Sequence, residues 1–325
     1  METTVTYVAL DVHGETIVAV WGRARETVQV LTVPNDARGR QRLADKVGRA
    51  NVWGVYEASS CGFGLYDELT AVGWRMSVVA PTKLTVSAKD RKQKTDGRDA
   101  RRLWDVLVAH GELGCALPAV WIPDVETRAN RAVGRRRLAL GEKLSGVKAG
   151  IRSLLQMHGV TRPETLKSPW TQKGKAWLRG LTGEKSTLAA AVRTALASDL
   201  RELEFLEEED TRVEQALAQL AEAPRYAAAV GRMRKTKGVG VLTAMVFLLE
   251  LGDPNRFRNR RQVGSYLGLV PSCHESGNAN DRKGHITRQG PPRVRKVLNQ
   301  AAWVYLRHNP ERRRWFLSVK HRRGT

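Results

Sequence analysis

The sequence is poor in cysteine and has no long apolar run. It has three cysteines in 325 residues, Cys61, Cys115 and Cys273, and their odd number and wide spacing argue against a disulfide framework or a multi-cysteine metal site. No stretch approaches roughly 18 consecutive apolar residues, and the N-terminus lacks a basic segment followed by an apolar one. We therefore expect a soluble, cytoplasmic protein with no membrane partner.

Acidic residues are scarce, most of all near the C-terminus. The chain has 55 Lys and Arg against 33 Asp and Glu, a formal net charge of +22. Residues 282–325 hold 13 Lys and Arg against the single acid Glu311. Aromatic residues such as Trp303 and Trp315 are interleaved with these charges, which favours a folded binding surface over a disordered tail. A polyanion, with nucleic acid as the first candidate, is the expected partner.

The first 123 residues have the pattern of an α/β domain. Three β-branched runs separated by turn residues predict an antiparallel meander, and helical and strand-like segments then alternate. The predicted strands are 5–12, 16–22, 27–34, 52–58 and 74–81, and the predicted helices are 37–50, 62–73 and 96–110. The pattern predicts a central sheet covered by helices.

Residues 124–225 have a helical pattern instead. A heptad-like stripe at Leu140, Leu144 and Ile151 is followed by a second stripe through an acidic segment, in which Asp210 interrupts the apolar seam. The pattern predicts a helical hairpin or coiled coil. A protruding or dimerising coiled coil and an ordinary two-helix core both fit it.

The last predicted domain, 226–325, is mainly α-helical. It opens with "TKGVGVLTAMVFLLELGD", in which a Gly-Val-Gly turn precedes an apolar helix, as in half of a helix-hairpin-helix element. Such a turn presents backbone N–H groups and the neighbouring Lys237 to a phosphate. A glycine turn between two packed helices is the alternative.

Four carboxylates stand at positions where they can converge. Asp11 and Glu57 end two predicted strands, while Asp96 and Asp99 lie one turn apart at the start of a predicted helix. Converging carboxylates repel each other unless a hard cation such as Mg²⁺ or Mn²⁺ accepts their oxygens. Each residue alone also fits a turn or helix-cap role. As a set in a basic frame, they predict a metal site that acts on phosphates.

The motifs resemble a known family, the DEDD transposases of the insertion sequence 110 and 1111 group, with the related Piv-type DNA invertases. The N-terminal motifs that carry the resemblance are "ALDVH", "VYEAS" and "KTDGRDA". The C-terminal motifs are "GVGVLTAMVFLLELGD", "FRNRRQVGSYLGLVPSCHESG" and "KGHITRQG". The resemblance implies a RuvC-like (RNase H-like) N-terminal domain, a coiled-coil middle region and a C-terminal transposase domain.

The resemblance also implies roles for individual residues. It assigns Asp11, Glu57, Asp96 and Asp99 to a metal-binding acidic tetrad, and it makes Ser276 the nucleophile on DNA, with Ser272 as the alternative. A serine hydroxyl needs proton removal or metal coordination to attack a phosphate. Cationic side chains around these motifs are candidate nucleic-acid contacts: Lys94, Arg98, Lys237, Lys283, Arg288, Arg293 and Arg295.

Relatives in this family are implied to be recombinases guided by an element-encoded, bridge-type RNA. The expected partners are therefore donor and target double-stranded DNA, a guide non-coding RNA, and further copies of the chain in a dimer to tetramer. The expected reaction joins strands through a phosphoserine intermediate. One alternative is a RuvC-like hydrolytic nuclease or Holliday junction resolvase, which needs the acids but not the serine. A second is a non-enzymatic nucleic-acid-binding protein.

Overall fold

A computed structural model describes residues 4–83, 96–274 and 282–323. The side chains of Asp96, Cys273, His274, Arg282 and Lys283 also lie outside the described part. Backbone contacts divide the chain into two compact units, Met1–Ile122 and Pro123–Thr325. The finer division into three domains stays a prediction.

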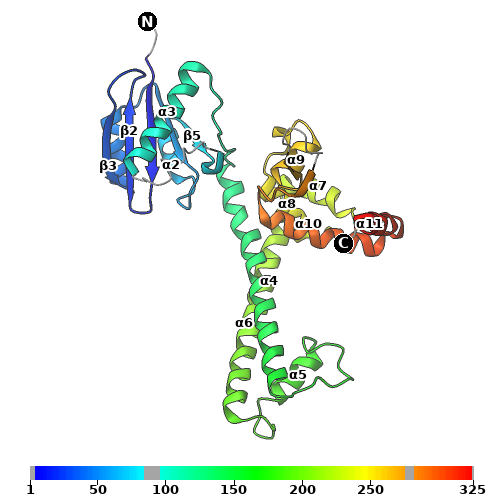
Figure 1. Ribbon diagram of the computed structural model, residues 1–325. Coiled ribbons are helices and arrows are strands. Elements are labelled where there is room, and N and C mark those ends of the chain that lie inside the picture. The colour runs from blue at the N-terminus through cyan, green and yellow to red at the C-terminus, as the bar shows by residue number, and fades with distance from the viewer. Residues whose placement is uncertain (1–3, 84–95, 275–281, 324–325) are drawn as a thin grey trace. The chain divides into compact units, whose positions relative to one another are not determined.

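The N-terminal unit is built on a five-stranded mixed sheet with the order β3-β2-β1-β4-β5 (Figure 1). The antiparallel meander β1-β2-β3 was predicted from the sequence, and β4 and β5 extend it in parallel with β1. The strands are β1 (Thr6–Val12), β2 (Thr16–Gly22), β3 (Gln29–Pro34), β4 (Val52–Glu57) and β5 (Arg75–Val79).

Two apolar layers cover the two faces of this sheet, because successive strand residues point to opposite sides. Helices α1 (Ala37–Val47) and α2 (Gly64–Ala71) pack on the face that carries Leu10 and Tyr56. Helix α3 (Asp96–Leu113) packs on the other face against Tyr7, Ala9 and Val55. The α/β architecture expected for this region is confirmed.

The second unit contains two long helices, α4 (Val125–Met157) and α6 (Ala190–Glu222). They run antiparallel, because Arg137 of α4 meets Asp210 at 2.9 Å while the later Lys148 meets the earlier Glu207 at 3.2 Å. Figure 1 shows the pair side by side. Short helix α5 (Gln172–Gly180) packs on α6 near one end of the hairpin.

The predicted seam is buried inside this hairpin. Leu140, Leu144 and Ile151 of α4 pack against a leucine stripe of α6. The α6 stripe consists of Leu196, Leu200, Leu203 and Leu206. Since each helix already buries its apolar stripe against the other, the two-helix core is formed within one chain. The intermolecular coiled coil stays a prediction.

The polar interruption of the seam is paired across the hairpin. Asp210 faces Arg137 as an ion pair without the alignment of a hydrogen bond. Burial raises the pKa of Asp210, and the nearby Arg137 only partly offsets this effect. The hairpin therefore carries a polar contact at a position where an apolar residue would fit the stripe.

The remainder of this unit is mainly helical, as predicted. Helices α7, α8 and α10 pack around the base of the hairpin, and a two-stranded ribbon of β6 and β7 lies before α10. The elements are α7 (Pro224–Arg234), α8 (Val241–Leu251), α9 (Arg260–Tyr266), β6 (Pro271–His274), β7 (Arg282–Ile286), α10 (Pro292–His308) and α11 (Pro310–Arg323). Within the described residues, no helix has both the length and the apolar composition to cross a bilayer.

Candidate active site

Asp11 and Glu57 lie at the same edge of the N-terminal sheet. The parallel pairing of β1 and β4 ends at Leu10 opposite Tyr56, and each strand continues by one carboxylate residue. Leu10 and Tyr56 point to the α1 and α2 face, so their successors belong to the face that α3 covers. Asp11 and Glu57 therefore lie on the same face of the sheet at the ends of two neighbouring strands. The sequence predicted their positions at strand ends.

Asp99 reaches this edge from helix α3. The helix is fixed on the sheet by Ala100, Leu103 and Leu107, which are buried, and by Trp104, whose indole N–H donates to the carbonyl oxygen of Tyr7 at 2.9 Å. Asp99 precedes this apolar stripe in the first turn of α3. The amphipathic pattern of the helix thus holds a carboxylate close to the sheet.

Glu57 and Asp99 line one small hollow, together with Arg102, Leu103 and Val106. Both carboxylates are half-buried. The hollow has a volume of about 10 Å³, which is the space of about one water-sized particle. Two carboxylates and one guanidinium around such a space can hold a cation or the oxygen of a phosphate.

Asp11 has a polar neighbour that the sequence prediction missed. Its Oδ2 lies 3.3 Å from Nε2 of His13, and its side chain is 23% exposed. The exposed Cys61, in the loop after β4, directs its Sγ toward the carbonyl oxygen of Val12 at 3.9 Å. His13 directly follows the end of β1, and its close spacing to Asp11 in "DVH" was the available signal for this contact.

The predicted fourth acid and the predicted nucleophile lie beyond what the structure describes. Asp96 begins α3, and its side chain is outside the described part, as are Lys94 and Ser276. Among the described residues, no three His, Cys, Asp or Glu side chains form a group arranged to hold a metal ion. The structure therefore shows two carboxylates in one hollow and the third at the adjacent strand end.

Ser272, the alternative nucleophile, is packed inside the β6-β7 ribbon. Its hydroxyl occupies the space where a side chain at Gly284 would begin. Ser272 is half-buried. This contact gives Ser272 a packing role in the ribbon.

The Gly-Val-Gly turn packs against α10. Gly238 has a φ of +90°, and a Cβ there would overlap the carbonyl oxygen of Ala301. Glycine is required at this position by both the conformation and the close approach. Gly238 therefore fits the alternative prediction for this motif, a glycine turn between packed helices. Lys237 beside it is exposed.

A second pair of glycines locks the segment before α10 to the end of α9. Gly268 has a φ of +66° and Gly290 a φ of +140°. A side chain at either position would overlap the backbone of the other segment, and the amide of Arg288 donates to the Gly268 carbonyl oxygen at 3.1 Å. The motifs around "GLVP" and "RQG" are thus two halves of one interlocked turn.

The predicted cationic contacts of the second unit differ in their surroundings. Lys237, Arg288 and Arg293 are exposed. Arg295 is half-buried, and its Nη1 donates to the carbonyl oxygens of Leu267 and Gly290, both at 3.0 Å. Arg295 therefore stabilises the interlocked turn, and its role as a phosphate contact stays a prediction. In the first unit, Arg98 is exposed beside Asp99.

A buried ion pair joins α4 to α8. Glu250 has a side chain only 7% exposed, and it accepts from Arg135 Nε at 2.7 Å and Nη2 at 2.9 Å. Burial alone would raise the pKa of Glu250, but the hydrogen bonds and charge of Arg135 and the charge of Arg131 hold this pKa below its ordinary value. Arg131 also donates to the carbonyl oxygen of Leu249 at 2.6 Å.

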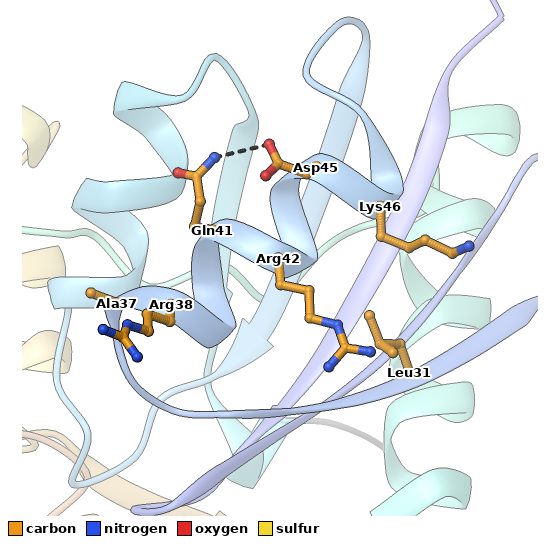
Figure 2. A pocket seen from close by; sticks show the side chains of 7 residues that line it. All are labelled: Leu31, Ala37, Arg38, Gln41, Arg42, Asp45 and Lys46. Atoms are coloured by element: carbon orange, nitrogen blue, oxygen red, sulfur yellow. Dashed lines mark hydrogen bonds between the residues drawn. The ribbon is translucent and has the colours of Figure 1, made fainter.

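A shallow hollow of the first unit lies away from these carboxylates. Figure 2 shows it along α1, where Arg38, Arg42 and Lys46 project beside Gln41, which donates to Asp45 at 2.9 Å. Its volume is about 750 Å³. Helix α1 covers the sheet face opposite α3. This shallow surface is therefore separate from the acidic hollow.

Comparison with known proteins identifies the class. Residues 231–316 match the family described as Transposase IS116/IS110/IS902 family. The chain is 34% identical over 78% of its length to a putative transposase, y4qE, of Sinorhizobium fredii, and 33% identical over 79% to a second, y4rJ. It is 25% identical over 92% of its length to the transposase for insertion sequence element IS1533 of Leptospira borgpetersenii, of which it spans 85%.

The chain is therefore similar to insertion-sequence transposases of the IS110/IS1111 family, and the match to the family model covers residues 231–316. It spans 59% and 66% of the lengths of the two Sinorhizobium relatives. The predicted resemblance is confirmed at the level of the family.

Proposed function

We propose that the chain is a DNA transposase that cuts and rejoins strands of an insertion sequence. The observation that carries this proposal is the hollow in which Glu57 and Asp99 meet, at the strand end next to Asp11. The similarity to insertion-sequence transposases supports the choice of DNA as substrate. The mixed sheet with α3 on one face supports a RuvC-like domain as the carrier of these acids.

The donor set fits a hard divalent cation. Carboxylate oxygens are the preferred ligands of Mg²⁺ and Mn²⁺. Asp11, Glu57, Asp96 and Asp99 are the proposed ligands, and two of them line the same hollow. A bound ion would neutralise phosphate charge and lower the pKa of a hydroxyl beside it.

The proposed chemistry is a transesterification on Ser276. Its Oγ bonds to phosphorus while the bond from phosphorus to the leaving strand oxygen breaks, and the departing oxygen accepts a proton. A carboxylate of the site takes the serine proton. A strand hydroxyl then attacks the phosphoserine, which releases Ser276 and forms a new phosphodiester. The number of phosphodiester bonds is conserved, so the exchange needs no external energy source.

The proposed partners are nucleic acids. The net charge of +22 suits contacts with many phosphates. An RNA guide would supply sequence recognition by base pairing, so that the protein needs only to hold backbones. Lys94, Arg98, Lys237, Lys283, Arg288, Arg293 and Arg295 are the proposed contacts. Sequencing of RNA that co-purifies with the protein tests this part of the proposal.

The acidic site is tested by matched variants on and near α3. Glu57→Gln and Asp99→Asn are expected to reduce strand cleavage by at least about 100-fold. Asp105→Asn is the control, because Asp105 lies on the same helix, is exposed and pairs with Arg101 at 3.2 Å. Normal cleavage by both site variants would refute the acidic site. Binding without any cleavage by the wild-type chain would instead favour the second alternative, a non-enzymatic binding protein.

The serine step is tested separately. Ser276→Ala is expected to abolish a covalent protein–DNA adduct, trapped on a nicked substrate and seen as a gel shift under denaturing conditions. Ser272→Ala serves as the control and is expected to keep the adduct. Free DNA ends produced at the normal rate by Ser276→Ala would show that the chain is a hydrolytic nuclease.

A further inference from the structure

The tip of the α4-α6 hairpin contains a pocket with no assigned role. It is formed where α4 ends, by the loop that follows and by α5, which Figure 1 shows in green at the far end of the hairpin from α8. Its volume is about 540 Å³, within the range of small-ligand sites. The pocket begins at Arg152, about 15 residues or roughly 22 Å of helix beyond Arg137, so it is separate from the ion pairs at the hairpin base.

The pocket wall is held in place by its own loop. Gly174 packs so closely against Ser168 and Pro169 that a Cβ would overlap both. Thr171 caps α5 by accepting from the Gly174 amide at 3.2 Å, and its hydroxyl donates to the Ser168 carbonyl oxygen at 3.0 Å. The loop amide of Val160 donates back to the Leu155 carbonyl oxygen at 2.9 Å. These contacts preform the pocket.

Two half-buried tryptophans, Trp170 and Trp177, line the pocket with apolar side chains such as Leu155. Such a lining offers flat surfaces for stacking. The ammonium of Lys148 lies 5.6 Å from the centre of the Trp170 ring, on the hairpin side. Trp170 is therefore held by a cation–π contact as well as by the loop.

The charged residues that line the pocket are all cationic. They are Arg152, Arg162 and Lys167, and each is exposed. Arg162 donates through Nη1 to the carbonyl oxygen of Lys167, which fixes the guanidinium at the rim. No carboxylate is among the described residues that line the pocket. An aromatic floor with a cationic rim is complementary to a planar group that carries a phosphate.

We propose that this pocket binds an unpaired base of a single-stranded nucleic acid, with the adjoining phosphate on Arg152, Arg162 and Lys167. A base stacks on tryptophan whatever its sequence, whereas a base inside a duplex is already stacked on its neighbours. The inference rests on the proposed function only for the choice of nucleic acid as the ligand. It adds a contact at the hairpin tip, distant in sequence from the acidic hollow.

The test compares oligonucleotides that differ only in their bases. A labelled dT12 and an abasic strand with the same number of phosphates are bound to the full chain and followed by fluorescence anisotropy. We expect dT12 to bind at least about five-fold more tightly than the abasic strand. Trp170→Ala is expected to reduce this ratio toward one, and Trp170→Phe to restore it. Trp315→Ala is the control, because Trp315 is 60% exposed on α11, outside the pocket.

Three outcomes would overturn the inference. The first is an unchanged ratio in Trp170→Ala, and the second is photo-crosslinks from 5-iodouracil strands that map outside residues 152–177. The third is a larger particle mass in light scattering that Trp170→Ala abolishes without nucleic acid present, since the pocket would then bind a second copy. Equal circular dichroism spectra and melting temperatures establish that the variants are folded.

The two proposals fail independently. If Asp99→Asn stops cleavage while Trp170→Ala leaves base preference unchanged, only the tip pocket is refuted. If Trp170→Ala loses base preference while Glu57→Gln and Asp99→Asn both cleave normally, only the acidic site is refuted.

Discussion

Replacing Glu250 by glutamine tests the buried ion pair that joins α4 to α8. The change keeps the size of the side chain and removes its charge. Breaking one partner of a buried pair costs about 3–5 kcal/mol. Arg135 is 43% exposed and can be hydrated again, so we reduce the expected loss for Glu250→Gln to about 2–3 kcal/mol. For a unit of about 200 residues, this corresponds to a melting temperature lower by roughly 4–12 °C.

The pH dependence of the difference separates charge from packing. The pKa of Glu250 is lowered in the folded state, so its stabilising contribution is present above the ordinary glutamate pKa and is lost as pH falls through the folded pKa. Melting temperatures of the wild type and Glu250→Gln, followed by circular dichroism, should therefore differ at pH 7 and converge in acid. Glu142→Gln, which removes an exposed partner of Lys296, is the control and should melt like the wild type. Equal melting at pH 7, or a gap that persists at the lowest pH where the protein is folded, would refute the reasoning.

Three further predictions concern single residues. Gly290→Ala should lower the free energy of unfolding by about 1–3 kcal/mol, because a Cβ would overlap the Tyr266 carbonyl oxygen at a φ that favours glycine. Gly146→Ala, in open space on α4, should instead raise the free energy of unfolding by about 0.5–1 kcal/mol. Urea titrations measure both changes. Asp210→Asn should raise the melting temperature at pH 7. Burial raises the pKa of Asp210, so this residue favours the folded state only while it is protonated, and that stabilisation is lost as pH rises through the folded pKa. An unchanged or lower melting temperature would contradict this. Burial and its hydrogen bond to Glu112 raise the pKa of Tyr7 to about 12. The difference between the ultraviolet absorbance titrations of the wild type and Tyr7→Phe should therefore show a step near pH 12. A step near pH 10 would contradict this value.

The strands and long helices were predictable because their apolar residues recur with periods that backbone geometry imposes. The alternation in β1 and β4 places Asp11 and Glu57 at strand ends, and the stripe after Asp99 places that residue at the start of a helix. These patterns are local, so they can be recognised in the sequence without knowledge of the tertiary structure. The positions of three of the four acids therefore followed from the sequence.

Long-range packing was not predictable in the same way. Gly238 has the spacing of a phosphate-binding turn, but its lack of a side chain is needed for contact with Ala301, more than 60 residues later. Arg102 looks like a solvated charge in the sequence, yet the helix turn places it beside Glu57 and Asp99. Such roles depend on which residues, distant in sequence, the fold places next to Gly238 or Arg102.

The continuous hairpin has a consequence for the reach of the second unit. At about 1.5 Å per residue, a helix of 33 residues is about 50 Å long, close to the rise of about 15 base pairs of duplex. Helix α8 packs on α4 at Gly134, about 20 residues from the tip pocket. A strand held at the tip would then be gripped about 30 Å, or about nine base pairs of duplex, from a strand held near α8. With the proposed contacts, the hairpin length sets the distance between them, and shortening α4 and α6 by equal numbers of residues would change the separation at which they engage one nucleic acid.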